Sequence, residues 1–262
     1  MVRNIICTAC FSLLLLMASF STVGVEQYQV QKIVIDAGHG GKDPGTHGVF
    51  SEEKDVALSV AKKLGDILNK YLPEVEVIYT RTDDTFIPLE GRADIANKNG
   101  ADLFVSIHAN AMPPGNESIY GTETYVMGTH KVEANLNVAR RENSVILMEE
   151  NFEERYAGYD PNAPGSHILF ALYQNAYLGN SLMLADKVES QFKHRVGRRS
   201  RGVKQAGFLV LWRTSMPSVL IELGYLTNPK EEKYLNDELG QTYIASGIFR
   251  AIRDYKNDIE TY

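Results

Sequence analysis

Two histidines in the chain each follow a short apolar segment and stand among small residues. His39 lies in AGHGG, after the β-branched run KIVID, and His108 lies in SIHANA, directly after LFV. In an open α/β sheet, ligands collect at the carboxyl ends of strands, so two histidines at strand ends can meet there. Neutral imidazole suits zinc, and a third oxygen ligand with an open fourth position makes a catalytic site. Either histidine alone is more simply explained as an ordinary hydrogen-bonded residue, and it is their equivalent placement that indicates a metal site.

Two glutamates are candidates to complete such a site. Glu222 interrupts the apolar segment SVLIELGY. Burying a carboxylate there is costly unless it is paired, protonated or close to a metal. Glu53 opens a predicted helix, where the helix dipole favours an acidic residue for structural reasons alone. The residues by themselves therefore favour a functional role for Glu222 and leave the role of Glu53 open.

The elements that must position these side chains alternate between strands and helices. Such alternation is typical of an α/β fold with a doubly wound sheet. We therefore predict a single α/β catalytic domain over residues 30–257, with a twisted, mostly parallel sheet of about six strands flanked by helices. β-Branched or apolar runs predict strands at 32–36, 75–79, 103–107, 123–127, 208–211 and 219–221, and apolar stripes predict helices at 53–71, 89–99, 231–235 and 243–255.

One region, about 129–180, does not follow this alternation. Residues 133–154 have a helical composition and spacing, and a Gly/Pro/Asn-rich stretch follows at 158–165. A second helical segment runs from about 167 to 194. We interpret 129–180 as a helical insertion that lies across the catalytic domain.

Residues 1–24 have the layout of a secretory signal peptide. The apolar run 5–20 is shorter than the roughly 20 residues that span a bilayer, so we expect cleavage and export, with no stable membrane span afterwards, rather than an uncleaved anchor. The two cysteines, Cys7 and Cys10, lie in this segment. The mature chain therefore has no disulfide, no Cys nucleophile and no Cys-ligated zinc. The formal net charge of −6 argues against nucleic acid as a partner.

Several motifs together resemble a known family. The segments IDAGHGGKDPG, EEKDVALSVAKKL, SIHANA, GTETYV, RGVKQAGFLVL and MPSVLIELGYLTN occur in this order between residues 32 and 256. They resemble the zinc-dependent N-acetylmuramoyl-L-alanine amidases of the type-3 family. The resemblance implies one Zn²⁺ per chain, held by His39, Glu53 and His108, with Glu222 as the catalytic acid. It also implies hydrolysis of the amide between N-acetylmuramic acid and the L-alanine of the stem peptide in peptidoglycan.

The insertion resembles that of family members that act in cell division. In those proteins a helix lies over the active site, and one of its glutamates fills the open position of the zinc. The segment ARRENS is similar to that block, which makes Glu142 the candidate autoinhibitory ligand. The resemblance implies a resting enzyme that an activator protein switches on by displacing the helix. It also implies a secreted, periplasmic enzyme with a role in division.

Two other functions stay open on the residues alone. A zinc peptidase that cuts within stem peptides would use the same chemistry. A wall-binding protein that has lost catalysis would keep the fold, but it would have no reason to keep all four site residues.

Six basic residues precede the predicted strand at 208–211. A run of charges is most often a solvated loop, and we expect that here, although such a cluster could contact the anionic wall. The six are Lys193, Arg195, Arg198, Arg199, Arg201 and Lys204.

Overall fold

The computed structural model describes residues 29–113, 115–116, 118–128, 132–156, 159 and 176–261. The predicted signal peptide and part of the predicted insertion lie outside these residues. One sheet is formed by β1 (Lys32–Ala37), β2 (Glu76–Tyr79), β3 (Leu103–Asn110), β4 (Thr122–Met127), β5 (Ser200–Ala206) and β6 (Ser218–Tyr225).

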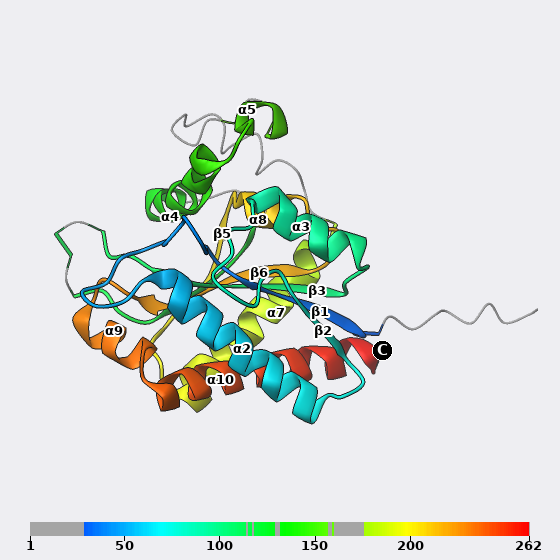
Figure 1. The fold of residues 1–262 in the computed structure, drawn as a ribbon. Coiled ribbons are helices and arrows are strands. Elements are labelled where there is room, and N and C mark those ends of the chain that lie inside the picture. Colours follow the sequence, from blue (N-terminus) through cyan, green and yellow to red (C-terminus); the bar gives the residue numbers. More distant parts are fainter. Residues whose placement is uncertain are drawn as a thin grey trace, which may run out of the picture.

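The strand order is β2-β1-β3-β6-β4-β5 (Figure 1). All neighbouring strands are parallel except β4 and β6, which pair antiparallel. The predicted α/β class and mostly parallel sheet are therefore confirmed.

The two central strands, β3 and β6, are buried along their whole length. Strands covered on both faces read as nearly continuous apolar runs, as LFV and SVLI do. Successive residues point to opposite faces of a sheet. Val105 and Ile107 therefore enter one hydrophobic core, and Phe104 enters the other.

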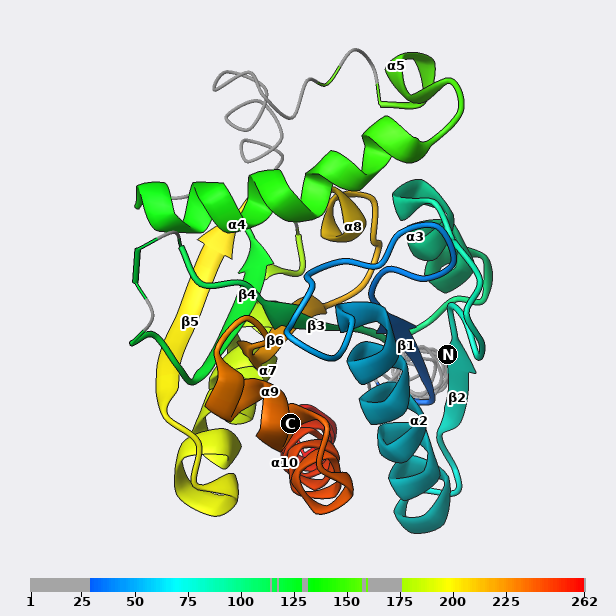
Figure 2. The same ribbon diagram turned by 60° about the vertical axis from the view of Figure 1, so that its left-hand side comes forward.

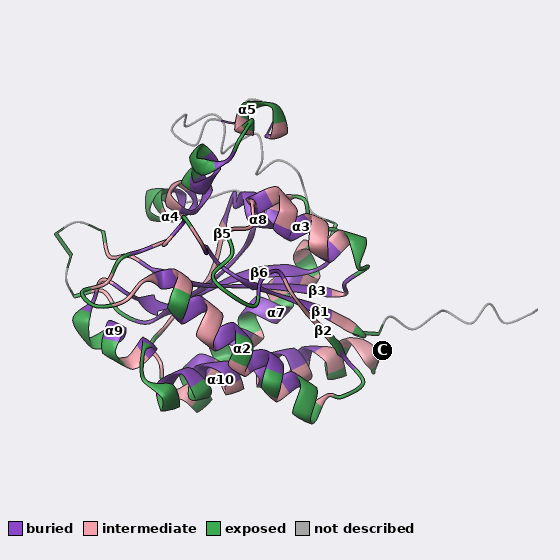
Figure 3. Ribbon diagram, in the orientation of Figure 1, coloured by how far each residue is buried: buried purple, intermediate pink, exposed green. Residues whose placement is uncertain are grey.

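Helices cover both faces of the sheet (Figures 1 and 2). Their inward sides are buried and their outward sides exposed (Figure 3). None of the helices in the described part of the chain is long and apolar enough to span a bilayer. One face carries α2 (Glu53–Tyr71), α7 (Leu178–Gln191) and α10 (Glu238–Glu260), and the other carries α3 (Leu89–Lys98), α8 (Leu209–Trp212) and the insertion, while α9 (Pro229–Leu235) follows the end of β6.

The strand predicted at 208–211 is wrong. These residues form the start of the short helix α8, and the strand in this part of the sheet is β5, Ser200–Ala206. A run of four apolar residues does not distinguish a strand from a buried helical turn. β5 lies at the edge of the sheet, where a strand need not be apolar, so its composition gave no strand signal.

The insertion is helical but is not one continuous helix to residue 154. α4 (Glu133–Asn143) tightens into the 3₁₀ helix η1 (Ser144–Met148), and α5 (Phe152–Arg155) follows after a break. The break coincides with Asn151, whose φ of 57° is left-handed, a conformation that asparagine tolerates better than most residues. Burial of Val145 and Ile146 against the domain accompanies the tighter turn.

The second helical segment of the prediction is confirmed only in its later part. α7 begins at Leu178, while 160–175 lie outside the described residues. The helix ends in a π-helical turn, η2 (Phe192–Val196), that Gly197 terminates with a φ of 76°.

Candidate active site

The side chains that the sequence analysis selected converge at the carboxyl edge of the sheet. His39 follows β1, and Glu53 is the first residue of α2. His108 on β3 and Glu222 on β6 are register partners on adjacent strands. All four are buried, so the fold places them together in one solvent-shielded region.

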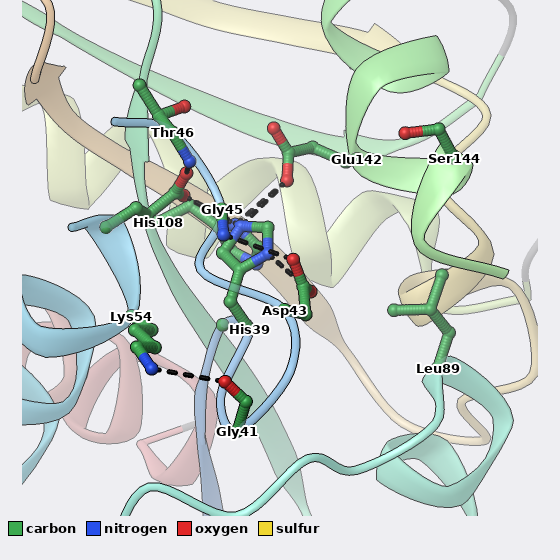
Figure 4. A network of polar contacts seen from close by, with 12 residues as sticks. His39, Gly41, Asp43, Gly45, Thr46, Lys54, Leu89, His108, Glu142 and Ser144 are labelled. Atoms are coloured by element: carbon green, nitrogen blue, oxygen red, sulfur yellow. Dashed lines mark hydrogen bonds and ion pairs between the residues drawn. The ribbon is translucent and has the colours of Figure 1, made fainter. Parts of the chain in front are cut away.

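Four atoms in this region are spaced like the ligands of a small cation. Oε1 of Glu53 lies 3.1 Å from Nε2 of His39 and 3.0 Å from Nδ1 of His108. Oε2 of Glu142 lies 3.3 Å and 3.2 Å from the same two nitrogens (Figure 4). Ligands about 2.0 Å from a tetrahedral zinc lie about 3.3 Å apart, so the donor set fits such an ion. Nε2 of His39 and Oε2 of Glu142 have no hydrogen-bond partner among the described residues.

Glycines allow the two imidazoles to approach. A Cβ on Gly38 would lie 2.5 Å from the His108 ring, and one on Gly45 would lie 2.5 Å from Cδ2 of His39. His39 itself adopts a left-handed φ of 60°, a conformation rare for residues other than glycine. Strained backbone of this kind is found at functional sites, where the surrounding structure holds it in place.

Two of the candidate ligands, His39 and Glu53, are also oriented by contacts outside the cluster. Nδ1 of His39 is 2.7 Å from Oδ2 of Asp43, which leaves Nε2 facing the other ligand atoms. Glu53 accepts hydrogen bonds from the backbone N–H of Ala109 at 2.9 Å and of Thr46 at 2.8 Å. These contacts hold the side chains in the arrangement that a metal requires.

A buried ion pair supports the loop that carries His39. Nη1 of Arg92 lies 2.8 Å from Oδ1 of Asp36, and Nη2 donates to the carbonyl of His39 at 2.7 Å. Nη2 of Arg81 donates to the carbonyl of Gly38 at 2.7 Å. The backbone around His39 is thus fixed by two guanidinium groups.

The electrostatics of the cluster call for positive charge at its centre. Burial lowers the pKa of His108, but hydrogen bonds to Glu142 and Glu53 outweigh it and raise that pKa to about 9. Burial opposes protonation of His39 as well, yet the charge of Glu53 raises its pKa well above the usual value. Burial raises the pKa of Glu53, and the charge of His39 outweighs it and lowers that pKa. Two carboxylates this close are balanced either by imidazolium or by a bound cation.

Glu222 lies beside this cluster and is not part of it. Neither of its carboxylate oxygens has a hydrogen-bond partner within the described residues, and its side chain is 1% exposed. Burial raises the pKa of Glu222 well above its usual value, and the charge of Glu142 raises it further. Such a carboxyl is suited to hold and transfer a proton.

Glu142 reaches the cluster from the insertion helix α4. Its other oxygen, Oε1, accepts a hydrogen bond of 3.0 Å from Nε of the neighbouring Arg141. Nη2 of Arg141 also donates to Oδ1 of Asn110 at 2.9 Å and lies 3.7 Å from Glu222. The insertion therefore brings an acid to the ligand cluster and a guanidinium to the neighbouring carboxyl.

Comparison with known proteins assigns the chain to a family. Residues 33–254 match the family model described as N-acetylmuramoyl-L-alanine amidase. The chain belongs to this family. The predicted relationship and the predicted enzyme class, an N-acetylmuramoyl-L-alanine amidase that acts on peptidoglycan, are confirmed.

Relatives support the same assignment. The amidase is 35% identical to N-acetylmuramoyl-L-alanine amidase AmiA of Escherichia coli (strain K12) over 227 residues, which are 85% of this chain and 75% of that protein. It is similar to the solved N-acetylmuramoyl-L-alanine amidase from Clostridium difficile 630, with a TM-score of 0.65 and 32% identity over 88% of this chain and 98% of that one. It is also similar to the CwlD amidase from Clostridioides difficile in complex with the GerS lipoprotein, with a TM-score of 0.63 and 26% identity over 87% and 99% of the two chains.

Several residues of the amidase site were missed by the sequence analysis. Asp43 had a signal, because it stands four residues after a candidate ligand in the Gly-rich loop. Arg92 and Asp36 had none, because they meet through a separation of 56 residues that only the fold closes. Arg141 was quoted as part of a motif, but its contacts depend on where α4 lies.

The prediction that the basic cluster is a solvated loop is wrong for most of its members. Lys193 and Arg195 are exposed but lie in η2, and three others form ion pairs. Nε of Arg201 lies 2.7 Å from Oε1 of the buried Glu123, and Lys204 forms an ion pair with the same oxygen. Arg198 lies 2.6 Å from Oε2 of Glu231. A register shift between β4 and β5 lies beside this group, and Gly202 has a left-handed φ of 85°. These charges are therefore structural parts of the edge of the sheet.

Proposed function

We propose that the chain cleaves the amide between N-acetylmuramic acid and L-alanine as a zinc enzyme, with one zinc held by His39, Glu53 and His108. The observation that carries this proposal is the convergence of their ligand atoms with that of Glu142, all within 4.8 Å of one another. A zinc ion held there would polarise the scissile carbonyl and lower the pKa of a water toward about 7.

Glu222 is the proton carrier in this proposal. It accepts the proton of the attacking water and delivers it to the nitrogen of L-alanine as the carbon–nitrogen bond breaks. The products are a lactyl carboxylate on the sugar and a free amine on the peptide. Burial raises the pKa of Glu222 above its usual value, so the carboxyl can hold the proton between the two steps.

We also propose that Glu142 is an autoinhibitory ligand. Its Oε2 occupies the fourth corner of the ligand set, where a catalytic zinc site must keep an open position. Arg141 acts as a positioning residue, because it holds the free oxygen of Glu142 and ties α4 to Asn110. Substrate can reach the site only after α4 moves.

The insertion is held by more than these two residues. Asn143 accepts a hydrogen bond from the N–H of Leu209 at 2.9 Å, and its own amide donates to the carbonyl of Gly207 at 2.7 Å. Val145 and Ile146 are buried in the domain core. Displacing α4 exposes these groups, so a binding partner must compensate for them.

Several considerations support an external activator and a role outside the cytoplasm. The related CwlD amidase was solved in complex with a lipoprotein, GerS. The signal-like residues 1–24 support secretion, and the resemblance of the insertion supports a periplasmic division enzyme. Peptidoglycan is the substrate whether or not an activator is required.

Replacing Glu222 by Gln tests the mechanism. We expect bound zinc to stay at one per chain and release of peptides from purified peptidoglycan to fall by on the order of 10²- to 10⁴-fold, because only the proton carrier is lost. Metal content and mass analysis of the released fragments measure both, in the wild-type and Glu142→Ala backgrounds. Glu238→Gln, on the exposed start of α10, is the control.

The same measurement separates the alternatives. Sugar chains without peptide indicate the amidase, whereas shortened peptides still attached to sugar indicate a peptidase. The alternative of a wall-binding protein without catalysis would be supported by one result. In that result, the zinc-loaded wild type and the Glu142→Ala variant both bind wall fragments and never cleave them. Unchanged activity of Glu222→Gln would overturn the assigned role of Glu222.

A further inference from the structure

A pocket of about 780 Å³ lies beyond the carboxyl ends of the two strands that carry His108 and Glu222. Met112 stands two residues after β3, and Thr227 stands two residues after β6. The N–H of Met112 donates to the hydroxyl of Thr227 at 2.8 Å, which ties the two loops together. The pocket is lined by Met112, Ser118, Tyr120, Thr227, Asn228, Pro229, Lys230 and Glu231.

The wall of this pocket is fixed by hydrogen bonds. The side-chain amide of Asn228 donates to the carbonyl of Ile119 at 3.0 Å, and its oxygen accepts from the N–H of Lys230 at 3.0 Å. The loop before β4 is thereby attached to the start of α9. Pockets of a few hundred to about a thousand Å³ with largely preformed walls are typical of ligand sites.

Of the two charged residues that line this pocket, only Lys230 is exposed and without a neutralising partner among the described residues. Glu231 is 5% exposed, and its carboxylate is neutralised by Arg198 at 2.6 Å and by the N–H of Gly121 at 3.0 Å. Lys230 is exposed, and Arg199 lies with its guanidinium 5.0 Å from the ring of Tyr120. Neither Lys230 nor Arg199 forms an ion pair within the described residues.

Apolar surface stands beside this charge. Tyr120 is 45% exposed, and the side chains of Met112 and Pro229 also line the pocket. A ligand that suits both parts carries short aliphatic groups and at least one carboxylate. A peptide with free carboxyl groups meets this description, and a neutral sugar does not use the charge.

We propose that this pocket is a subsite for the stem peptide, in which Lys230 binds a free carboxylate of the peptide. The proposal rests on the proposed function, because the stem peptide leads away from the amide that is cleaved beside His108 and Glu222. The pocket adjoins that edge of the sheet, and Lys230 is a specificity-determining residue for acidic stem peptides.

The insertion does not close this subsite. None of the residues that line the pocket comes from α4 or η1, and α9 lies away from α4 in space (Figure 2). A smaller hollow of about 270 Å³, lined by His39, Glu53, Arg141 and Glu142 among others, lies beneath the insertion instead. The resting protein therefore binds peptide at the Lys230 pocket before α4 opens.

Peptide binding to the full chain tests the subsite without requiring turnover. The probe is a synthetic tetrapeptide that begins with L-alanine and has free side-chain and C-terminal carboxylates, titrated by calorimetry beside its fully amidated twin. We expect the free acid to bind more tightly than the twin. Lys230→Ala should weaken it by about fivefold, as for one exposed ion pair, and Lys230→Glu should weaken it further.

Lys233→Ala is the matched control, because Lys233 is also exposed on α9 but does not line the pocket. Equal binding of the free and amidated peptides, equal binding by wild type and Lys230→Glu, or no binding to wild type would each overturn the subsite. Peptide binding that depends on Lys230, in a protein that never cleaves peptidoglycan, would support the subsite and contradict the proposed reaction. Cleavage of peptidoglycan without Lys230-dependent peptide binding would support the reaction and contradict the subsite.

Discussion

The two sides of the ligand cluster are built differently. His39 follows β1, Glu53 begins α2 and His108 lies on β3. Buried hydrogen bonds with Asp43, Arg92 and backbone N–H groups orient His39 and Glu53. Glu142 belongs to the insertion, and its second oxygen is held only by the neighbouring Arg141 among the described residues.

The proposed autoinhibition depends on this difference, because it requires the insertion to be displaced while the other candidate ligands stay in place. His108 cannot leave without disrupting the core, because β3 is buried along its whole length, and Glu53 is buried at the start of α2. The insertion is attached through side chains such as Asn143 and Glu149 and through buried apolar side chains that include Val145, Ile146 and Tyr156. A segment attached in this way can move as a unit while the rest of the site stays intact.

The largest effect is expected from a substitution that disturbs His39, and it concerns the affinity for zinc. Asp43→Asn removes the carboxylate that orients His39, and loss of such a partner typically costs 10- to 100-fold in metal affinity. Zinc titration of the metal-stripped protein against a competing chelator measures this change. Asp94→Asn, on the exposed face of α3, should leave the affinity unchanged, and an unchanged affinity for Asp43→Asn would show that the contact is not functional.

Removing the carboxylate that the insertion contributes should raise activity instead of lowering it. Glu142→Ala empties the fourth corner of the ligand set, and we expect peptide release from peptidoglycan to rise by roughly tenfold, the effect of about 1.4 kcal/mol on the closed state. Glu133→Ala, an exposed acid on the same helix, is the control. Arg141→Ala should raise activity less, because Glu142 remains. Equal rates for wild type and Glu142→Ala would contradict the proposed autoinhibition.

The smallest effect concerns two buried acids near β4 with opposite pKa shifts. Burial raises the pKa of Glu123, but Lys204 and Arg201 outweigh it and lower that pKa. The unfolded chain then binds more protons as pH falls below about 4.5, so the stability from Glu123 is present above that pH and is lost toward acid. Burial raises the pKa of Glu189, so its contribution is lost as pH rises above about 4.5.

Urea unfolding of two Gln variants between pH 3.5 and 6.5 tests these signs. Relative to wild type, Glu123→Gln should lose about 1 kcal/mol more at pH 6.5 than at pH 3.5, and Glu189→Gln should show the opposite trend. The same trend for both variants would contradict the different environments of the two acids.

Much of the fold and of the candidate site could be predicted from local sequence. Most strands and helices were predicted because long apolar stripes and short β-branched runs have clear periods. His39, His108 and Glu222 were recognisable as strand-end or strand-interrupting polar residues. Glu53 and Glu142 needed the family resemblance, since an acid at a helix start or on a helix face has an ordinary structural explanation.

The rest depended on contacts that no local pattern contains. FLVL forms a helical turn and SRGVKQA a strand, because the edge position and the ion pairs to Glu123 outweigh local hydrophobicity. The sequence alone therefore determined the class of fold, the enzyme family and the candidate ligands, all of which are encoded in short segments. Only the tertiary structure decided that Arg141 faces Glu222, that Arg92 holds the loop of His39, and that Lys230 borders a pocket, because each depends on segments far apart in the chain.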